Sequence, residues 1–401
     1  MIFGAIASDI ISSHHISNPD AAFTLTRLPA GASPTGNTVL ALAAAEWLIE
    51  DSEHTAEILT AYIDKWMQKF PSAGYDSENP YTVCAIPIGL YAGTTEEALH
   101  LSQIAGDAMQ AGNTSCIKAV AGAICLTHNG AGKEEIKRYI EKILDYNLSN
   151  SNTAAATAIR FFLESSSLEE TIRRAILSGN STTATIAGAI AAATPSDGYS
   201  VSKELERECI SVMPGRMINY AYAFNHLLKH PTTDTPIRNS YKVDDRVYAG
   251  EYPATANETL GRRDMERFAR FGITHFIDLT ENCELLPYTQ WLRESQRHIR
   301  FAIKDCGVPS ENSQVKRLLE TITGILKNKE NKVYIHCRGG IGRTGTIVAC
   351  YYAMFLREYG PVCDLLQRQY SQCPKSAYRD TPETLEQKRF IMQFIDYIRK
   401  Q

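Results

Sequence analysis

Apolar and small residues recur every three or four positions through the first 230 residues, as in NTVLALAAAEWLIED, EEALHLSQIAGDAMQAG and GKEEIKRYIEKILDY. This spacing is typical of helices, and runs with the alternation of a β-strand are few. Asn37 or Thr38 is a suitable cap for the first segment, and Gly132 precedes the acidic start of the third. We therefore expect this half of the chain to be almost entirely helical.

The second half has a different pattern, in which short strand-like segments alternate with segments of helical spacing. The expected strands are RVYAG, THFIDLT, IRFAIK and KVYIHC, and the expected helices lie near residues 262–271, through Trp291, from Ser310 and after Gly342. Such alternation predicts an α/β domain built on a largely parallel sheet.

The segment HPTTDTPIRN separates the two patterns. It contains two prolines and three threonines and has no apolar period, which is typical of a linker. A chain of 401 residues is also long for one hydrophobic core. We expect two domains, residues 1–230 and residues 231–401.

Composition narrows the classes of partner. The formal net charge of -4 gives no broad attraction for nucleic acid or for an anionic membrane. The N-terminal MIFGAIASDIISS lacks the basic region of a signal peptide, and the apolar run 184–193 is too short to span a bilayer. The ten cysteines form neither a CxxC pair nor a zinc-type cluster, so we expect reduced thiols, no metal site and a cytoplasmic protein.

The segment VYIHCRGGIGRTGT, residues 333–346, carries the strongest chemical signal. It predicts a buried strand ending at Cys337, a glycine-rich turn, and a helix that begins near Arg343. Backbone N–H groups in such a turn, at the positive end of a helix, form a site for a dianion. The expected phosphate-binding residues are Arg338, Gly339, Gly340, Ile341, Gly342 and Arg343.

These residue types suit phosphoryl transfer through a covalent intermediate. The donors around Cys337 favour its thiolate, which would attack phosphorus, while the guanidinium of Arg343 would hold two phosphate oxygens. Thr344 is placed to donate its hydroxyl to the sulfur and so ease its departure from a thiophosphate intermediate.

HCRGGIGRTG resembles the signature of the protein tyrosine and dual-specificity phosphatases. Residues 239–253 and 276–288 also resemble a bacterial-type dual-specificity subgroup. The resemblance implies a phosphomonoesterase that needs no cofactor, and it implies that His336 supports the cysteine loop structurally.

Phosphatases of this kind need a general acid on a mobile loop. Asp305, in IKDCGVPS, follows a strand and precedes Gly307 and Pro309, which favours it over Asp278, an aspartate in a hydrophobic run that is more typical of a turn cap. The family resemblance assigns Gln387 to positioning the hydrolytic water, although a glutamine on a solvated helix face is the alternative. Cys306 is either a bystander thiol or a partner for a protective disulfide with Cys337.

The substrate is less defined than the reaction. Only Arg338 adds positive charge within the loop, whereas phosphoinositide phosphatases tend to have more, so a phosphotyrosine protein is the leading expectation, with phosphoserine or phosphothreonine in addition. A phosphorylated small molecule, nucleotide or lipid remains an alternative.

The helical half resembles the ADP-ribosylglycohydrolases in the order of four motifs. They are GAIASDIISS from Gly4, TGNTVLALAAAEWLI from Thr35, NPYTVCAIPIGL from Asn79 and SGNSTTATIAGAIAAA from Ser178. The aspartates that bind paired magnesium ions in that family are replaced here by Gly36, Asn37, Gly179 and Ser181. Because magnesium requires anionic oxygen ligands, we expect an inactive domain. Three roles remain open for it: binding ADP-ribose or a related nucleotide, docking substrates, or a purely structural function. A bifunctional enzyme that also removes ADP-ribose is a further alternative.

Overall fold

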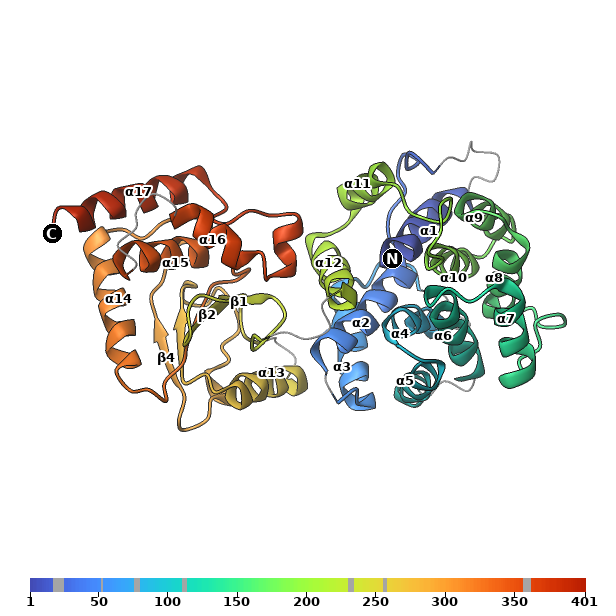
Figure 1. Ribbon diagram of the computed structural model, residues 1–401, viewed down its shortest axis with the longest axis horizontal. Coiled ribbons are helices and arrows are strands. Elements are labelled where there is room, and N and C mark those ends of the chain that lie inside the picture. The colour runs from blue at the N-terminus through green and yellow to red at the C-terminus, as the bar shows by residue number, and fades with distance from the viewer. Residues whose placement is uncertain are drawn as a thin grey trace. The chain divides into compact units, whose positions relative to one another are not determined.

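In a computed structural model, the chain folds into two compact units, Met1–Pro231 and Thr232–Gln401 (Figure 1). The structure describes residues 1–16, 25–51, 53–75, 80–109, 114–229, 234–254, 258–355 and 362–401. Part of the predicted linker, residues 230–233, and Asn79 of the third helical motif lie outside these ranges. No helix in the described ranges is long and apolar enough to cross a membrane.

The first unit is helical, as the apolar spacing predicts. Its elements are α1 (Ile2–His15), α2 (Gly36–Glu50), α3 (Ala56–Lys69), η1 (Pro80–Cys84), α4 (Ala85–Tyr91), α5 (Thr95–Ala108), α6 (Thr114–His128), α7 (Lys133–Arg138), η2 (Tyr139–Ile143), α8 (Ala154–Glu164), α9 (Leu168–Leu177), α10 (Ser181–Ala192), α11 (Lys203–Val212) and α12 (Gly215–Lys229).

Small residues allow α1 and α10 to pack closely. A Cβ atom added to Gly4 would lie 2.1 Å from the Cβ of Ala192, and one added to Gly188 would lie 1.7 Å from the Oγ of Ser8. The N-cap of α2 is Thr35, so the prediction of Asn37 or Thr38 as its cap is wrong. The helix begins earlier because Asp9 of α1 accepts hydrogen bonds from the backbone at its N-terminus.

The second unit contains a five-stranded, mostly parallel sheet, which confirms the predicted α/β class. The strands are β1 (Ser240–Lys242), β2 (Val247–Gly250), β3 (His275–Asp278), β4 (Arg297–Arg300) and β5 (Val333–His336). Their order is β1-β2-β5-β3-β4, and β1 alone among these pairs is antiparallel to its neighbour.

Helices cover both faces of this sheet (Figure 1). Successive residues of β5 point to opposite faces, so Val333 and Ile335 join one core while Tyr334 joins the other. Helix α13 (Glu258–Phe271) covers the Tyr334 face. The opposite face is covered by α14 (Asn312–Leu326), α15 (Gly342–Phe355), α16 (Val362–Tyr370) and α17 (Leu385–Arg399).

Two expected elements differ from the structure. The segment through Trp291 forms only the short 3-10 turn η3 (Thr289–Trp291). A Cβ on Gly261 would lie 2.2 Å from the Trp291 ring, so packing on α13 sets the path of this segment. Strand β4 ends at Arg300 instead of continuing to Lys304, although Ile303 N still donates to Leu279 O at 3.0 Å.

Candidate active site

The candidate site lies at the carboxyl edge of the parallel sheet. Gly250, His336, Asp278 and Arg300 align in register as the last residues of four neighbouring strands. Cys337 follows directly after β5 and is buried, with 3% of its surface exposed. Parallel sheets bring loops together at this edge, which explains why the chemistry predicted from separate segments converges here.

The chain turns tightly through residues 337–343, here called the Cys337 loop. Gly340 has a φ of +73°, and a Cβ at this position would lie 2.3 Å from the carbonyl carbon of Gly250. Only glycine fits both the conformation and the space. Helix α15 then begins at Gly342, which places Arg343 in its first turn, while Arg338 is exposed at the start of the loop.

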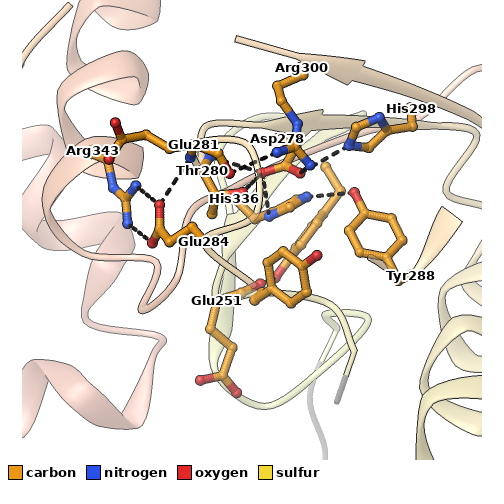
Figure 2. Close-up of polar contacts among 12 residues, drawn as sticks. Glu251, Asp278, Thr280, Glu281, Glu284, Tyr288, His298, Arg300, His336 and Arg343 are labelled. Atoms are coloured by element: carbon orange, nitrogen blue, oxygen red, sulfur yellow. Dashed lines mark hydrogen bonds and ion pairs between the residues drawn. The ribbon is translucent and has the colours of Figure 1, made fainter. Parts of the chain in front are cut away.

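Arg343 is buried and held by several oxygens (Figure 2). Its two terminal nitrogens donate to the two carboxylate oxygens of Glu284, each at 2.7 Å, and Nη1 also donates to Ile303 O at 3.0 Å. Burial opposes the charge of the guanidinium, but Glu284, Cys337 and Asp305 together outweigh it and raise the pKa of Arg343. Conversely, hydrogen bonding to Arg343 lowers the pKa of Glu284 despite its partial burial. Sequence reasoning missed Glu284, although it lies within the segment quoted for the family resemblance.

Asp305 lies next to the same guanidinium. Its Oδ1 is 2.9 Å from Nη2 of Arg343, while 53% of its side chain remains exposed. The neighbouring Cys306 has a φ of +59° and an exposed thiol, and all ten cysteines of the chain are free. The structure thus brings Asp305 to the Cys337 loop, on a segment whose side chains face solvent.

Asp278 is unsuited to exchange protons with a substrate because it is completely buried. It accepts hydrogen bonds from Thr280 N at 2.9 Å, His298 Nε2 at 3.0 Å and Arg300 Nη2 at 2.8 Å (Figure 2). Burial would raise the pKa of Asp278, but the hydrogen bonds from His298 and Thr280, together with the nearby His336, lower it well below its usual range. The contact to Thr280 is the turn cap that the sequence predicts.

His336 is enclosed beneath the loop. Its Nε2 lies 2.7 Å from the Tyr288 hydroxyl, and its Nδ1 lies 3.9 Å from Oδ1 of Asp278 (Figure 2). Burial lowers the pKa of His336 to about 4, although Asp278 opposes the shift. The imidazole is therefore neutral near pH 7, which suits a structural support.

Gln387 is buried, so the alternative of a solvated helix face is wrong. Its Oε1 accepts hydrogen bonds from Glu383 N and Thr384 N, each at 3.0 Å, as part of the cap of α17. Its Nε2 donates to Gly307 O at 3.1 Å. The side chain thereby connects α17 to the Asp305 segment, and the water-positioning role stays a prediction.

The Thr344 hydroxyl is buried and has no hydrogen-bond partner among the residues that the structure describes. A buried polar group without a partner costs free energy, so such a group merits a functional explanation. The expected hydrogen bond from Thr344 to the Cys337 sulfur stays a prediction.

In the helical unit, three of the sequence motifs meet at one carboxylate. Asp9 is buried and accepts hydrogen bonds from six donors, which are the backbone N and hydroxyl groups of Thr35 and Thr38, the Asn37 amide and the Thr185 hydroxyl. Asn37 also donates to Ser181 Oγ at 3.2 Å. Sequence reasoning missed Asp9, although a carboxylate within an apolar helix signals a need for donors.

This cluster does not suit a pair of magnesium ions. Among the residues that the structure describes, Asp9 is its one carboxylate, and neutral hydroxyl and amide donors already surround both oxygens. Hard divalent cations need several anionic or carbonyl oxygens with free lone pairs. Within the described ranges, no group of three or more His, Cys, Asp and Glu side chains is arranged to hold a metal ion.

Comparison with known proteins identifies relatives of the second unit. Residues 254–390 match a family model described as Swiss Army Knife protein, DSP-PTPase phosphatase domain. Putative tyrosine phosphatase 067L of Invertebrate iridescent virus 3 is 30% identical over 164 residues, which are 39% of this chain and 64% of the viral protein. Human dual specificity protein phosphatase CDC14A is 31% identical over 84 residues, which are 21% of this chain and 13% of CDC14A. The chain thus spans less than two thirds of either relative.

Solved structures with a likeness to the chain include Tk-PTP in its active form. That alignment covers 41% of this chain and 97% of Tk-PTP, with 24% identity and a TM-score of 0.31. The human tyrosine phosphatase-like serine/threonine/tyrosine-interacting protein aligns with 41% of this chain and 99% of its own, with 20% identity and a TM-score of 0.33.

Proposed function

We propose that this protein hydrolyses phosphomonoesters through Cys337, because the chain contains a protein tyrosine/dual-specificity phosphatase domain that is homologous to known phosphatases. Such a domain implies phosphorylated substrates. The observation that carries the assignment to this loop is the placement of Cys337 and Arg343. They are the two ends of one glycine-rich loop at the N-terminus of α15, and the guanidinium is buried and fixed by Glu284.

In the first step, the Cys337 sulfur attacks phosphorus, and an S–P bond forms as the ester P–O bond breaks. The leaving oxygen takes a proton from Asp305. Arg343 and the backbone N–H groups of the loop stabilise the charge on the equatorial oxygens. In the second step, water attacks phosphorus, its proton returns to Asp305, and the sulfur leaves with a hydrogen bond from Thr344.

The ion pair between Asp305 and Arg343 must break for this cycle to run. In that pair the Asp305 carboxylate faces the guanidinium and not a leaving group. An incoming phosphate dianion would replace Asp305 on the guanidinium. The exposed Asp305 side chain would then be free to turn toward the leaving group.

We propose a phosphotyrosine protein as the main substrate, with phosphoserine or phosphothreonine in addition. Arg338 is the exposed positive charge of the Cys337 loop. A second cation near the loop, Lys375, is buried and paired with Glu251, so it adds no free charge for a polyphosphorylated ligand. The loop therefore suits one phosphate group.

For the helical unit we propose a degenerate ADP-ribosylglycohydrolase-like domain that docks substrates or regulates the phosphatase domain. The convergence of its motifs around Asp9 supports this proposal, since a shared fold explains why those segments meet. In one form of this proposal the helical unit still binds ADP-ribose, and direct titration with ADP-ribose would test this.

The test of the phosphatase assignment compares the full chain with Cys337→Ser and Arg343→Ala on an aryl phosphate. Both variants should lose hydrolysis while circular dichroism shows an intact fold, because the first lacks the nucleophile and the second the anion clamp. Substantial turnover by folded Cys337→Ser protein would exclude this nucleophile. Phosphotyrosine, phosphoserine and inositol phosphate substrates, compared by kcat/KM, would then rank the substrate classes.

A further inference from the structure

Three carbonyl groups of the Cys337 loop accept hydrogen bonds from segments other than the loop itself and helix α15. Tyr252 N donates to Arg338 O at 3.2 Å, Lys375 Nζ donates to Gly339 O at 3.1 Å, and Thr381 Oγ1 donates to Ile341 O at 2.8 Å. In a planar trans peptide the C=O and the following N–H point in opposite directions. Donors that hold the carbonyls on one side therefore direct the amide hydrogens to the other.

Lys375 differs from the other two donors because it carries a charge and is buried. It lies in the 3-10 turn η4 (Pro374–Ala377), and only 3% of its side chain is exposed. Its Nζ is 2.6 Å from Oε2 of Glu251, whose Oε1 accepts a hydrogen bond from Asn239 Nδ2 at 3.1 Å. A buried lysine is rare without a partner, and the pair with Glu251 explains why Lys375 can be buried. The pair does not explain why Lys375 also contacts the Cys337 loop.

The peptide group that Lys375 contacts joins two glycines. Gly339 and Gly340 have no side chains to resist rotation of the peptide between them, and glycine populates many backbone conformations at little cost. Gly340 is already in the left-handed region and lies against the backbone of Gly250. This peptide is therefore the part of the loop that most needs an external restraint.

We propose that Lys375 is a positioning residue of the phosphatase site, which holds Gly339 O so that the Gly340 N–H faces the bound phosphate. The inference rests on the proposed function of the Cys337 loop. Glu251 orients the ammonium and offsets its charge, so Lys375 acts through the backbone of the loop and not by binding substrate. Neither the loop sequence nor its spacing points to a residue so far downstream.

The experiment measures binding and turnover separately in the full chain. Inorganic phosphate is titrated by calorimetry into proteins that carry Cys337→Ser, with Lys375 intact or replaced by Met or Arg. Aryl phosphate hydrolysis is measured with Cys337 intact. Lys332→Met is the matched control, because Lys332 Nζ also donates to a backbone carbonyl, Phe271 O at 3.0 Å, in the same unit but away from the loop.

Lys375→Met should weaken phosphate binding about tenfold or more, since one amide donor to the anion is lost or misdirected. KM for the aryl phosphate should rise by a similar factor, whereas loss of folded protein would lower kcat at an unchanged KM. Lys375→Arg should restore most of the affinity, because it keeps a charged donor, and Lys332→Met should bind like the parent.

Unchanged phosphate affinity in folded Lys375→Met would overturn the proposal. If that variant fails to fold because the partly buried Glu251 loses its ion-pair partner, the double variant Glu251→Gln/Lys375→Met removes the remaining charge and should show the same loss of affinity. A parent protein that binds phosphate but hydrolyses no phosphomonoester would overturn the proposed function. The binding comparison would still decide the role of Lys375.

Discussion

The Glu284 carboxylate binds the Arg343 guanidinium at two points, with both oxygen–nitrogen distances at 2.7 Å. A two-point contact fixes the plane of the guanidinium as well as its position. The orientation in which Arg343 meets a phosphate therefore depends on a residue from the loop after β3, far away in the sequence.

Glu284→Gln should leave the Arg343 guanidinium in the site but with a less well defined orientation. We expect kcat/KM for an aryl phosphate to fall about 10- to 100-fold, the scale of loss that misplacement of a reacting group produces. Steady-state kinetics would measure it, with the same substitution at the exposed Glu294 as control. Activity equal to the control would mean that Ile303 O and the fold alone position the arginine.

Asp305→Asn should affect substrates according to their leaving groups. Loss of the general acid should lower kcat/KM for phenyl phosphate about 100-fold or more, and much less for p-nitrophenyl phosphate, whose leaving group needs little protonation. Asp245→Asn serves as control because the Asp245 side chain is 97% exposed. Equal losses on both substrates would exclude Asp305 as the acid, and Asp278 could replace it only if its buried ion pairs opened.

His336 should make the stability of the second unit depend on pH. Its pKa is lowered from 6.5 to about 4, so the unfolded chain takes up a proton before the folded one does. The contribution of neutral His336 to the free energy of unfolding is fully present above pH 6.5 and is lost as the pH falls toward 4. From that difference we expect a loss of about 3 kcal/mol in the free energy of unfolding.

Differential scanning calorimetry of the full chain would measure this pH dependence. The transition to follow is the one whose midpoint temperature changes when vanadate is added. His336→Gln should flatten the dependence between pH 6.5 and 4. An equally steep dependence in the variant would assign the effect to another group.

Asp9→Asn should destabilise the helical unit without impairing the phosphatase. The carboxylate accepts six hydrogen bonds from neutral donors, two of them from the backbone at the start of α2, so we expect a loss of about 2–4 kcal/mol. Calorimetry of the full chain would show this loss of stability, and Asp64→Asn on the exposed face of α3 is the control.

Hydrolysis of aryl phosphate by the full chain should also survive EDTA. Magnesium-dependent release of ADP-ribose by the wild-type chain would contradict our interpretation of this unit.

Much of this architecture could be predicted from the sequence because local patterns determine it. The continuous apolar run of Val333, Tyr334 and Ile335 is typical of a strand that is buried on both faces, and the glycines after Cys337 permit a turn that few other residues could adopt. The helical class of the first half followed from apolar spacing in the same way. In each case the residues that give the signal are neighbours along the chain.

The tertiary structure decided what depends on distant residues meeting. Glu284 reaches Arg343 across 59 positions and Lys375 reaches Gly339 across 36, and neither carboxylate nor ammonium has a local pattern that marks its partner. The burial of Gln387 and the reduction of the Trp291 segment to one turn also depend on packing against other elements. A sequence determines which groups are available, but a charged side chain acquires its role only from the groups that surround it when the chain is folded.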